Sequence, residues 1–213
     1  MRSIGFVSGL IMLAAVPAEA QSLDCSLATG VVQEAICGSE TLRSLNDEMT
    51  RLYTLALNSS DMTEERTAEL KNSQKNWLTE RGKCISSTLD LKVCIANADA
   101  MRIHELRTAY AVHRASDDGV SIGPVIYNCE GVGAPVSAVF INTMEHMVSL
   151  SWEGRRMVLP QVISGSGARY HTEFPGAGEA TFWDHGKGAL FAPPGKDPVE
   201  CIKATGNLPP ITE

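Results

Sequence analysis

Apolar positions in the first half of the chain recur at three- and four-residue steps, as one face of a helix requires. Three helices are predicted between residues 31 and 114. The first places five apolar side chains on one face: Leu42, Leu45, Met49, Leu52 and Ala56. A polar break at residues 58–61 precedes the second helix, which Asp61 is expected to cap. The third spans about residues 91–113, so the N-terminal half is predicted to be all-α.

The pattern becomes strand-like after residues 115–122, a polar, glycine-containing stretch that we interpret as a linker. Beyond it, short runs rich in β-branched and aromatic residues alternate with turn-like segments. They predict about eight strands, at residues 125–129, 136–141, 147–152, 156–159, 168–172, 180–183, 189–192 and around 201. So many short strands favour a small antiparallel barrel, because closure removes exposed strand edges.

The predicted fold class is therefore two domains: an all-α, disulfide-stapled three-helix domain at residues 21–114 and an all-β barrel at residues 123–213. The six cysteines are Cys25, Cys37, Cys84, Cys94, Cys129 and Cys201. The last two bracket the barrel and are expected to pair. Among the first four, Cys37 and Cys84 would be neighbours in a helical hairpin, which favours Cys37–Cys84 and leaves Cys25–Cys94. Pairing of Cys25 with the nearby Cys37 stays open.

Residues 1–20 have the layout of an export signal. Arg2 supplies a positive start, residues 4–16 are apolar, and small residues precede a cleavage site after Ala20. The first cysteine, Cys25, lies five residues beyond Ala20, so no lipid anchor is expected. No other apolar run approaches the length of a membrane span. The mature protein is predicted to be periplasmic or secreted.

Charge and motifs exclude several classes of function. Both halves are acidic, with 11 basic against 15 acidic residues in 21–122 and 6 against 9 in 123–213, so no nucleic-acid footprint exists. An acidic surface suits solubility or a basic partner. Residues 164–168 lack the glycine spacing of a nucleophile elbow, and residues 186–188 lack the pattern of a phosphate loop. The histidines show no metal-ligand spacing. We expect no enzyme activity, no metal and no cofactor.

Residues 23–110 resemble the N-terminal domain of LprI-type lysozyme inhibitors. The residues that carry the resemblance are Cys25, Glu34-Ala35-Ile36-Cys37, Leu45-Asn46, Tyr53, Gln74, Trp77, Arg81, Cys84 and Cys94. Tyr53 and Trp77 are expected in the core, and Arg81 is expected to pair with an acidic residue inside the domain.

Residues 125–202 resemble the MliC/PliC family of inhibitors of c-type lysozyme. The most specific match is Ser166-Gly167-x-x-Tyr170, within the run Ser164-Gly165-Ser166-Gly167-Ala168-Arg169-Tyr170. The cysteine bracket and strand spacing around it agree with the family. The family's second loop ends in Thr-Lys-Gly, and here it reads Asp184-His185-Gly186, so His185 holds the lysine position and Lys187 lies two residues later.

The resemblance implies an exported inhibitor whose partner is c-type lysozyme. Ser166 would enter the lysozyme cleft and engage its catalytic carboxyl groups, with His185 or Lys187 supplying a cation beside it. The further expected binding residues are Gly167, Arg169, Tyr170 and Gly186. Tyr170 can also support the loop from the barrel, and Arg169 can face solvent. The alternative is an envelope-associated module that binds glycan or another protein and has a non-inhibitory barrel. An exported hydrolase ranks last.

Overall fold

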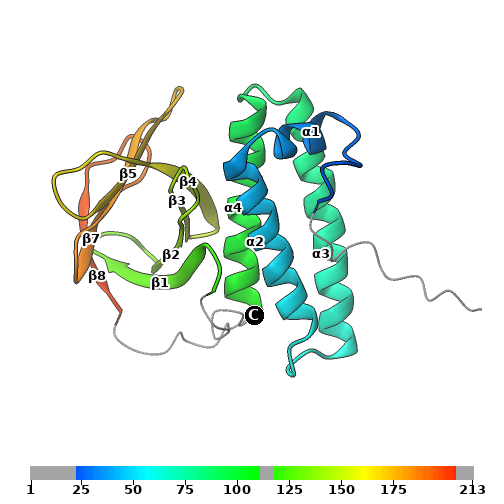
Figure 1. Ribbon diagram of the computed structural model, residues 1–213. Coiled ribbons are helices and arrows are strands. Elements are labelled where there is room, and N and C mark those ends of the chain that lie inside the picture. The colour runs from blue at the N-terminus through cyan, green and yellow to red at the C-terminus, as the bar shows by residue number, and fades with distance from the viewer. Residues whose placement is uncertain (1–22, 111–117, 205–213) are drawn as a thin grey trace, which may run out of the picture.

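The computed structural model describes residues 23–110 and 118–204 (Figure 1). The predicted signal segment with its cleavage site, and residues 115–117 of the predicted linker, lie outside these ranges. The first half forms α1 (Val31–Cys37), α2 (Glu40–Leu57), α3 (Glu64–Gly82), the 3-10 helix η2 (Lys83–Ser86) and α4 (Leu91–Ala109). The all-α half is confirmed, with one short α-helix more than predicted. None of the described helices is both long and apolar enough to cross a membrane.

Side-chain caps fix where the three long helices begin. The side chain of Ser39 accepts a hydrogen bond from the backbone N–H of Leu42, at the start of α2. The side chain of Asp90 accepts hydrogen bonds from the backbone N–H groups of Lys92 and Val93, in the first turn of α4. The cap of α3 is Thr63, not Asp61 as predicted. Asp61 still belongs to the turn between α2 and α3, because the N–H of Met62 donates to Ser59 O. Helix α3 therefore starts only after Thr63.

The family-specific residues of the helical half are structural, as expected. Tyr53 is fully buried, and the indole N–H of Trp77 donates to Ala98 O. Arg81 forms an ion pair with the buried Asp99 at 3.3 Å and lies 4.3 Å over the Trp77 ring. This cluster joins α3 to α4.

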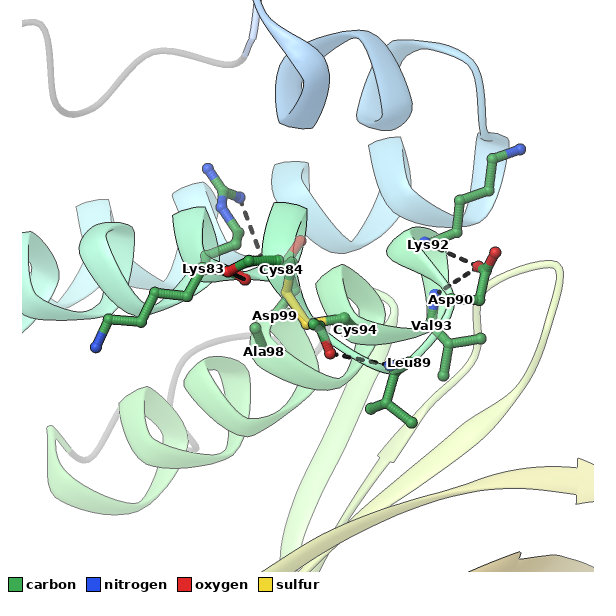
Figure 2. The surroundings of a disulfide bond; sticks show 12 residues. Lys83, Cys84, Leu89, Asp90, Lys92, Val93, Cys94, Ala98 and Asp99 are labelled. Carbon is green, nitrogen blue, oxygen red and sulfur yellow. Dashed lines mark hydrogen bonds and ion pairs between the residues drawn. A yellow bond between two sulfur atoms is a disulfide. The ribbon is translucent and has the colours of Figure 1, made fainter. Parts of the chain in front are cut away.

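The favoured pairing Cys37–Cys84 with Cys25–Cys94 is wrong, whereas the alternative left open, Cys25–Cys37, is observed. The disulfides are Cys25–Cys37 and Cys84–Cys94, each with a Cα–Cα distance of 5.6 Å. The prediction placed Cys37 before the first long helix and paired it across the helical hairpin, but Cys37 ends the separate short helix α1, close to Cys25. Likewise, Cys84 lies in η2, and the chain folds back within ten residues to place Cys94 in the first turns of α4 (Figure 2). Both bonds therefore close short local loops.

The second half is a closed antiparallel barrel with strand order β1 to β8, which confirms the predicted fold. The strands are β1 (Ser121–Cys129), β2 (Val136–Ile141), β3 (Met147–Trp152), β4 (Arg155–Val162), β5 (Ala168–Phe174), β6 (Gly178–Asp184), β7 (Gly188–Ala192) and β8 (Val199–Lys203). The predicted disulfide Cys129–Cys201 is confirmed, and its two residues are direct partners in the β1–β8 pairing that closes the barrel. Strand β1 begins at Ser121, within the stretch predicted as linker.

Helix α4 packs on the outer wall of the barrel and contacts β1, β2, β3 and β4. Figure 1 shows it between the barrel and the other helices. The outward-facing side chains of Val139, Ile141, Met147 and Val158 belong to the same apolar core as α2 and α4. The two halves thus share one core, while a second core fills the barrel interior.

Buried polar contacts add to this interface. Arg107 of α4, 1% exposed, donates to Gly123 O at 2.9 Å and to Ser121, whose hydroxyl in turn contacts Glu48. His104 has Nδ1 2.9 Å from Ser149 O and Nε2 2.9 Å from Ser137 Oγ. Since a carbonyl oxygen only accepts, Nδ1 carries the proton of the neutral ring. Burial lowers the pKa of His104 to about 4.

His104→Gln is expected to change how stability depends on pH. Between pH 6.5 and 4 the unfolded chain binds a proton at His104 that the folded protein does not, so stability falls as the pH decreases through this window. The full loss is about 3 kcal/mol. Gln hydrogen-bonds the same partners but does not titrate.

Urea unfolding of both proteins at pH 7 and pH 4.5 measures the difference. Burial raises the pKa of Asp99 to about 6, which acts in the opposite direction, but Asp99 is common to both proteins and cancels from their difference. An equal loss of stability on acidification in both proteins would contradict the assigned role of His104.

Candidate functional site

The candidate residues gather at one end of the barrel. Because neighbouring strands are antiparallel, the loops at residues 142–146, 163–167 and 185–187 all lie at this end. Ala168 and Asp184, which adjoin two of these loops, are direct partners in the β5–β6 pairing. The structure therefore places the predicted Ser166 loop next to the predicted loop at residues 185–187.

The backbone of the Ser166 loop is held by hydrogen bonds from two side chains. The hydroxyl of Ser164 donates to Ser166 O at 3.2 Å and to Gly167 O at 3.0 Å. From the other side, Trp183 Nε1 donates to Ser166 O at 2.9 Å. Ser166 is exposed, and within the described residues no hydrogen bond uses its hydroxyl. The hydroxyl of Ser166 is thus available to hydrogen-bond a partner molecule, on a loop whose backbone is held in place.

Gly167 is required by the way this loop meets β6. Its φ is +64°, a region that disfavours residues with a side chain. A Cβ there would lie 2.3 Å from Asp184 O and 3.2 Å from Trp183 Nε1. Any side chain at this position would therefore push the Ser166 loop away from the strand that supports it.

The second loop is connected to the first through Trp183. The ring of His185 meets the Trp183 ring edge to face, with centroids 5.8 Å apart, so one indole contacts both loops. The ammonium group of Lys203, on β8, fixes the base of this loop. It forms an ion pair with Asp184 at 3.0 Å and donates a hydrogen bond to Gly186 O at 2.9 Å. Lys187 is exposed, and its backbone carbonyl accepts from the N–H of Lys203.

Arg169 and Tyr170 lie on opposite faces of β5. Arg169 is exposed, whereas Tyr170 is 3% exposed and points into the barrel, 5.8 Å from the ring of Phe140. Burial, together with the nearby Asp184 carboxylate, raises the pKa of Tyr170 to about 12. In this structure Tyr170 supports the loop from within.

Sequence reasoning missed three residues of this end. Trp183 was not among the expected binding residues, and no sequence pattern predicted its hydrogen bond to Ser166 O. Lys203 lies near the last strand, far in sequence from the loop that it fixes. Ile163, just before the loop, is 102% exposed, and the sequence pattern gave no sign that this apolar residue at the end of a strand faces solvent.

No group of three or more His, Cys, Asp and Glu side chains in residues 23–110 and 118–204 has the arrangement to hold a metal ion. The chemistry available at this end includes a hydroxyl donor, an imidazole, the exposed amine of Lys187 and exposed apolar surface.

Comparison with known proteins defines the class. Residues 127–200 match the family described as membrane-bound lysozyme-inhibitor of c-type lysozyme. The chain is also 30% identical over 171 residues to Lipoprotein LprI of Mycobacterium tuberculosis (strains H37Rv and CDC 1551) and of Mycobacterium bovis. These matches cover 79% of this chain and 78% of each relative, and the chain belongs to the LprI family. No solved structure matches it significantly.

Gly167→Ala is expected to destabilise the protein more than the matched control Gly186→Ala. Both glycines have positive φ, +64° and +84°, so each variant loses about 1–2 kcal/mol from backbone strain. A Cβ at Gly186 would meet no atom within 4 Å, whereas the one at Gly167 would clash with Asp184 O. Thermal or urea unfolding should show a further loss of about 1–3 kcal/mol for Gly167→Ala. Equal losses would mean that the loop does not pack on β6 as described.

Proposed function

We propose that this protein is an exported inhibitor of c-type lysozyme that inserts the Ser166 loop into the active-site cleft of the enzyme. The observation that carries the proposal is the available hydroxyl of Ser166, presented on a fixed backbone in a barrel that matches the lysozyme-inhibitor family. Export through residues 1–20 belongs to the proposal, and three disulfides suit an oxidising compartment.

The chemistry of the target explains why a hydroxyl suffices. A c-type lysozyme cleaves sugar chains with two carboxyl groups, one acting as proton donor and the other as nucleophile or stabilising anion. The Ser166 hydroxyl would donate a hydrogen bond to one of these groups and occupy the place of water and of a substrate oxygen. Since Ser164 and Trp183 already fix the loop, little conformational entropy is lost when it binds.

His185 is the cation that we propose beside Ser166. Its ring lies against Trp183, the same side chain that holds Ser166 O, which keeps the imidazole close to the loop. A protonated imidazole would hold a lysozyme carboxylate ionised and occupied. Gly167 and Gly186 permit the positive φ angles of the two loops, and the buried Tyr170 supports the Ser166 loop from inside the barrel. Arg169 and Lys187 would lie at the rim of the interface.

Ser166→Ala should weaken inhibition without loss of stability, because the hydroxyl has no described partner within the chain. A hydrogen bond to a charged group contributes about 1.5–3 kcal/mol, so the inhibition constant should rise about 10- to 150-fold. Inhibition of lysozyme in a lysis assay measures this change. Ser60→Ala, at an exposed serine between α2 and α3, is the matched control and should leave inhibition unchanged. A change of less than twofold in Ser166→Ala would remove Ser166 from the mechanism.

Paired variants test which side chain supplies the cation beside Ser166. His185→Ala should raise the inhibition constant for c-type lysozyme at least about tenfold, because it removes the imidazole that is proposed to contact a lysozyme carboxylate. Lys187→Ala, at the exposed lysine two residues later, should change the inhibition constant less than about twofold. A lysis assay measures the inhibition constants of the wild type and both variants. Inhibition that is kept in His185→Ala and lost in Lys187→Ala would assign the cation to Lys187 instead.

A further inference from the structure

A cleft of about 940 Å³ opens between the first turns of α4 and the loop end of the barrel. Residues 90–97 lie on the helical side, and the loops at residues 142–146 and 163–167 lie on the barrel side. Ser164 and Gly167 are among the lining residues, so the cleft begins where the Ser166 loop begins. The helical half and the candidate loop therefore border one continuous surface.

The surface of the cleft is mainly apolar, although charged and polar side chains also line it. Val93 of α4 is 49% exposed, and on the barrel side Met144 is 68% and Ile163 102% exposed. Leu89, also 49% exposed, lies near Val93 beside the Cys84–Cys94 disulfide, as Figure 2 shows. Flexible methionine and exposed aliphatic side chains are typical of surfaces that bind proteins. No Phe, Tyr or Trp lines the cleft, which disfavours a sugar as the occupant.

We infer that the helical half supplies part of the lysozyme interface, with the rim of the enzyme's active site seated in this cleft against Val93, Met144 and Ile163. The inference rests on the proposed function and extends it. A stable protein complex buries about 800 Å² on each partner. The two short loops that carry Ser166 and His185 are too small to bury this area alone. A bound enzyme must therefore also cover the surface next to them. On the side of Ile163 and Ser164, that surface is the cleft.

Rigidity and charge agree with this occupant. The shared core and the buried contacts of His104 and Arg107 fix α4 against the barrel, so the cleft exists before binding and little ordering is required. Asp90 and Glu145 lie among its lining residues, beside the single lysine Lys92, in a chain of net charge −7. Acidic groups at the edge favour encounter with a basic protein surface.

Val93→Arg in the full-length protein tests the inference, with Leu78→Arg as the matched control. Leu78 is 43% exposed on α3 and does not line the cleft, so the two changes are alike in chemistry and exposure. Val93→Arg should raise the inhibition constant for c-type lysozyme at least tenfold, and Leu78→Arg should change it less than twofold. Met144→Arg, on the opposite wall, should act like Val93→Arg and serves as the second variant if Val93→Arg unfolds at a lower temperature than the wild type.

The outcomes separate the inference from the proposed function. Absence of inhibition by the wild type overturns both. Inhibition that is lost in Ser166→Ala but kept within twofold in Val93→Arg and Met144→Arg overturns the inference alone. Peptidoglycan fragments that bind the wild type but not Val93→Arg, with lysozyme inhibition equal in the two proteins, also overturn it and assign the cleft to glycan.

Discussion

Packing of α4 on the outer face of β1–β4 is the contact on which the rest of the structure depends. Outward-facing residues of the barrel, such as Val139 and Val158, complete the core of the helices. Arg107 and His104 place polar groups inside the same interface, where each needs its partners because water does not reach it. This contact sets where the start of α4 lies relative to the barrel loops, and it thereby shapes the cleft beside Ser166.

The loop end of the barrel combines a fixed backbone with an available side chain. Trp183 is central, since its indole holds Ser166 O and also contacts the His185 ring. Gly167 allows the loop to approach β6 closely, and Lys203 fixes the following loop from the last strand. In a mechanism that blocks an active site, such rigidity reduces the entropy lost on binding, so a small number of contacts can be effective.

Much of the barrel was predictable from sequence because alternating β-branched runs and turn residues act locally. The predicted strands 136–141 and 147–152 have the observed bounds, and Cys129–Cys201 followed from the need for the first and last strands to meet. The sequence did not decide the early disulfides, because Cys25–Cys37 and a bond across the helical hairpin both agreed with it, and the short helix α1 was not predicted. The packing of α4 left a signal in β2, where residues 138–141 are apolar on both faces, but this run cannot say what covers the outer face.

Prediction of the site had a similar limit. The motif around Ser166 and Gly167 identified the loop, because a glycine-framed serine is visible in one short run of sequence. The roles of Trp183, Lys203 and Ile163 depend on which strands are neighbours and on which side chains remain exposed, and only the assembled barrel determines these. The role of α4 in the cleft depends on a contact between residues far apart in the chain.

The proposed blockade of the lysozyme active site is tested most directly by steady-state inhibition of the enzyme at several concentrations of a soluble oligosaccharide substrate. If the Ser166 loop occupies the substrate cleft, the apparent inhibition constant must rise in proportion to the substrate concentration above KM. An apparent inhibition constant that stays the same at every substrate concentration would contradict the account.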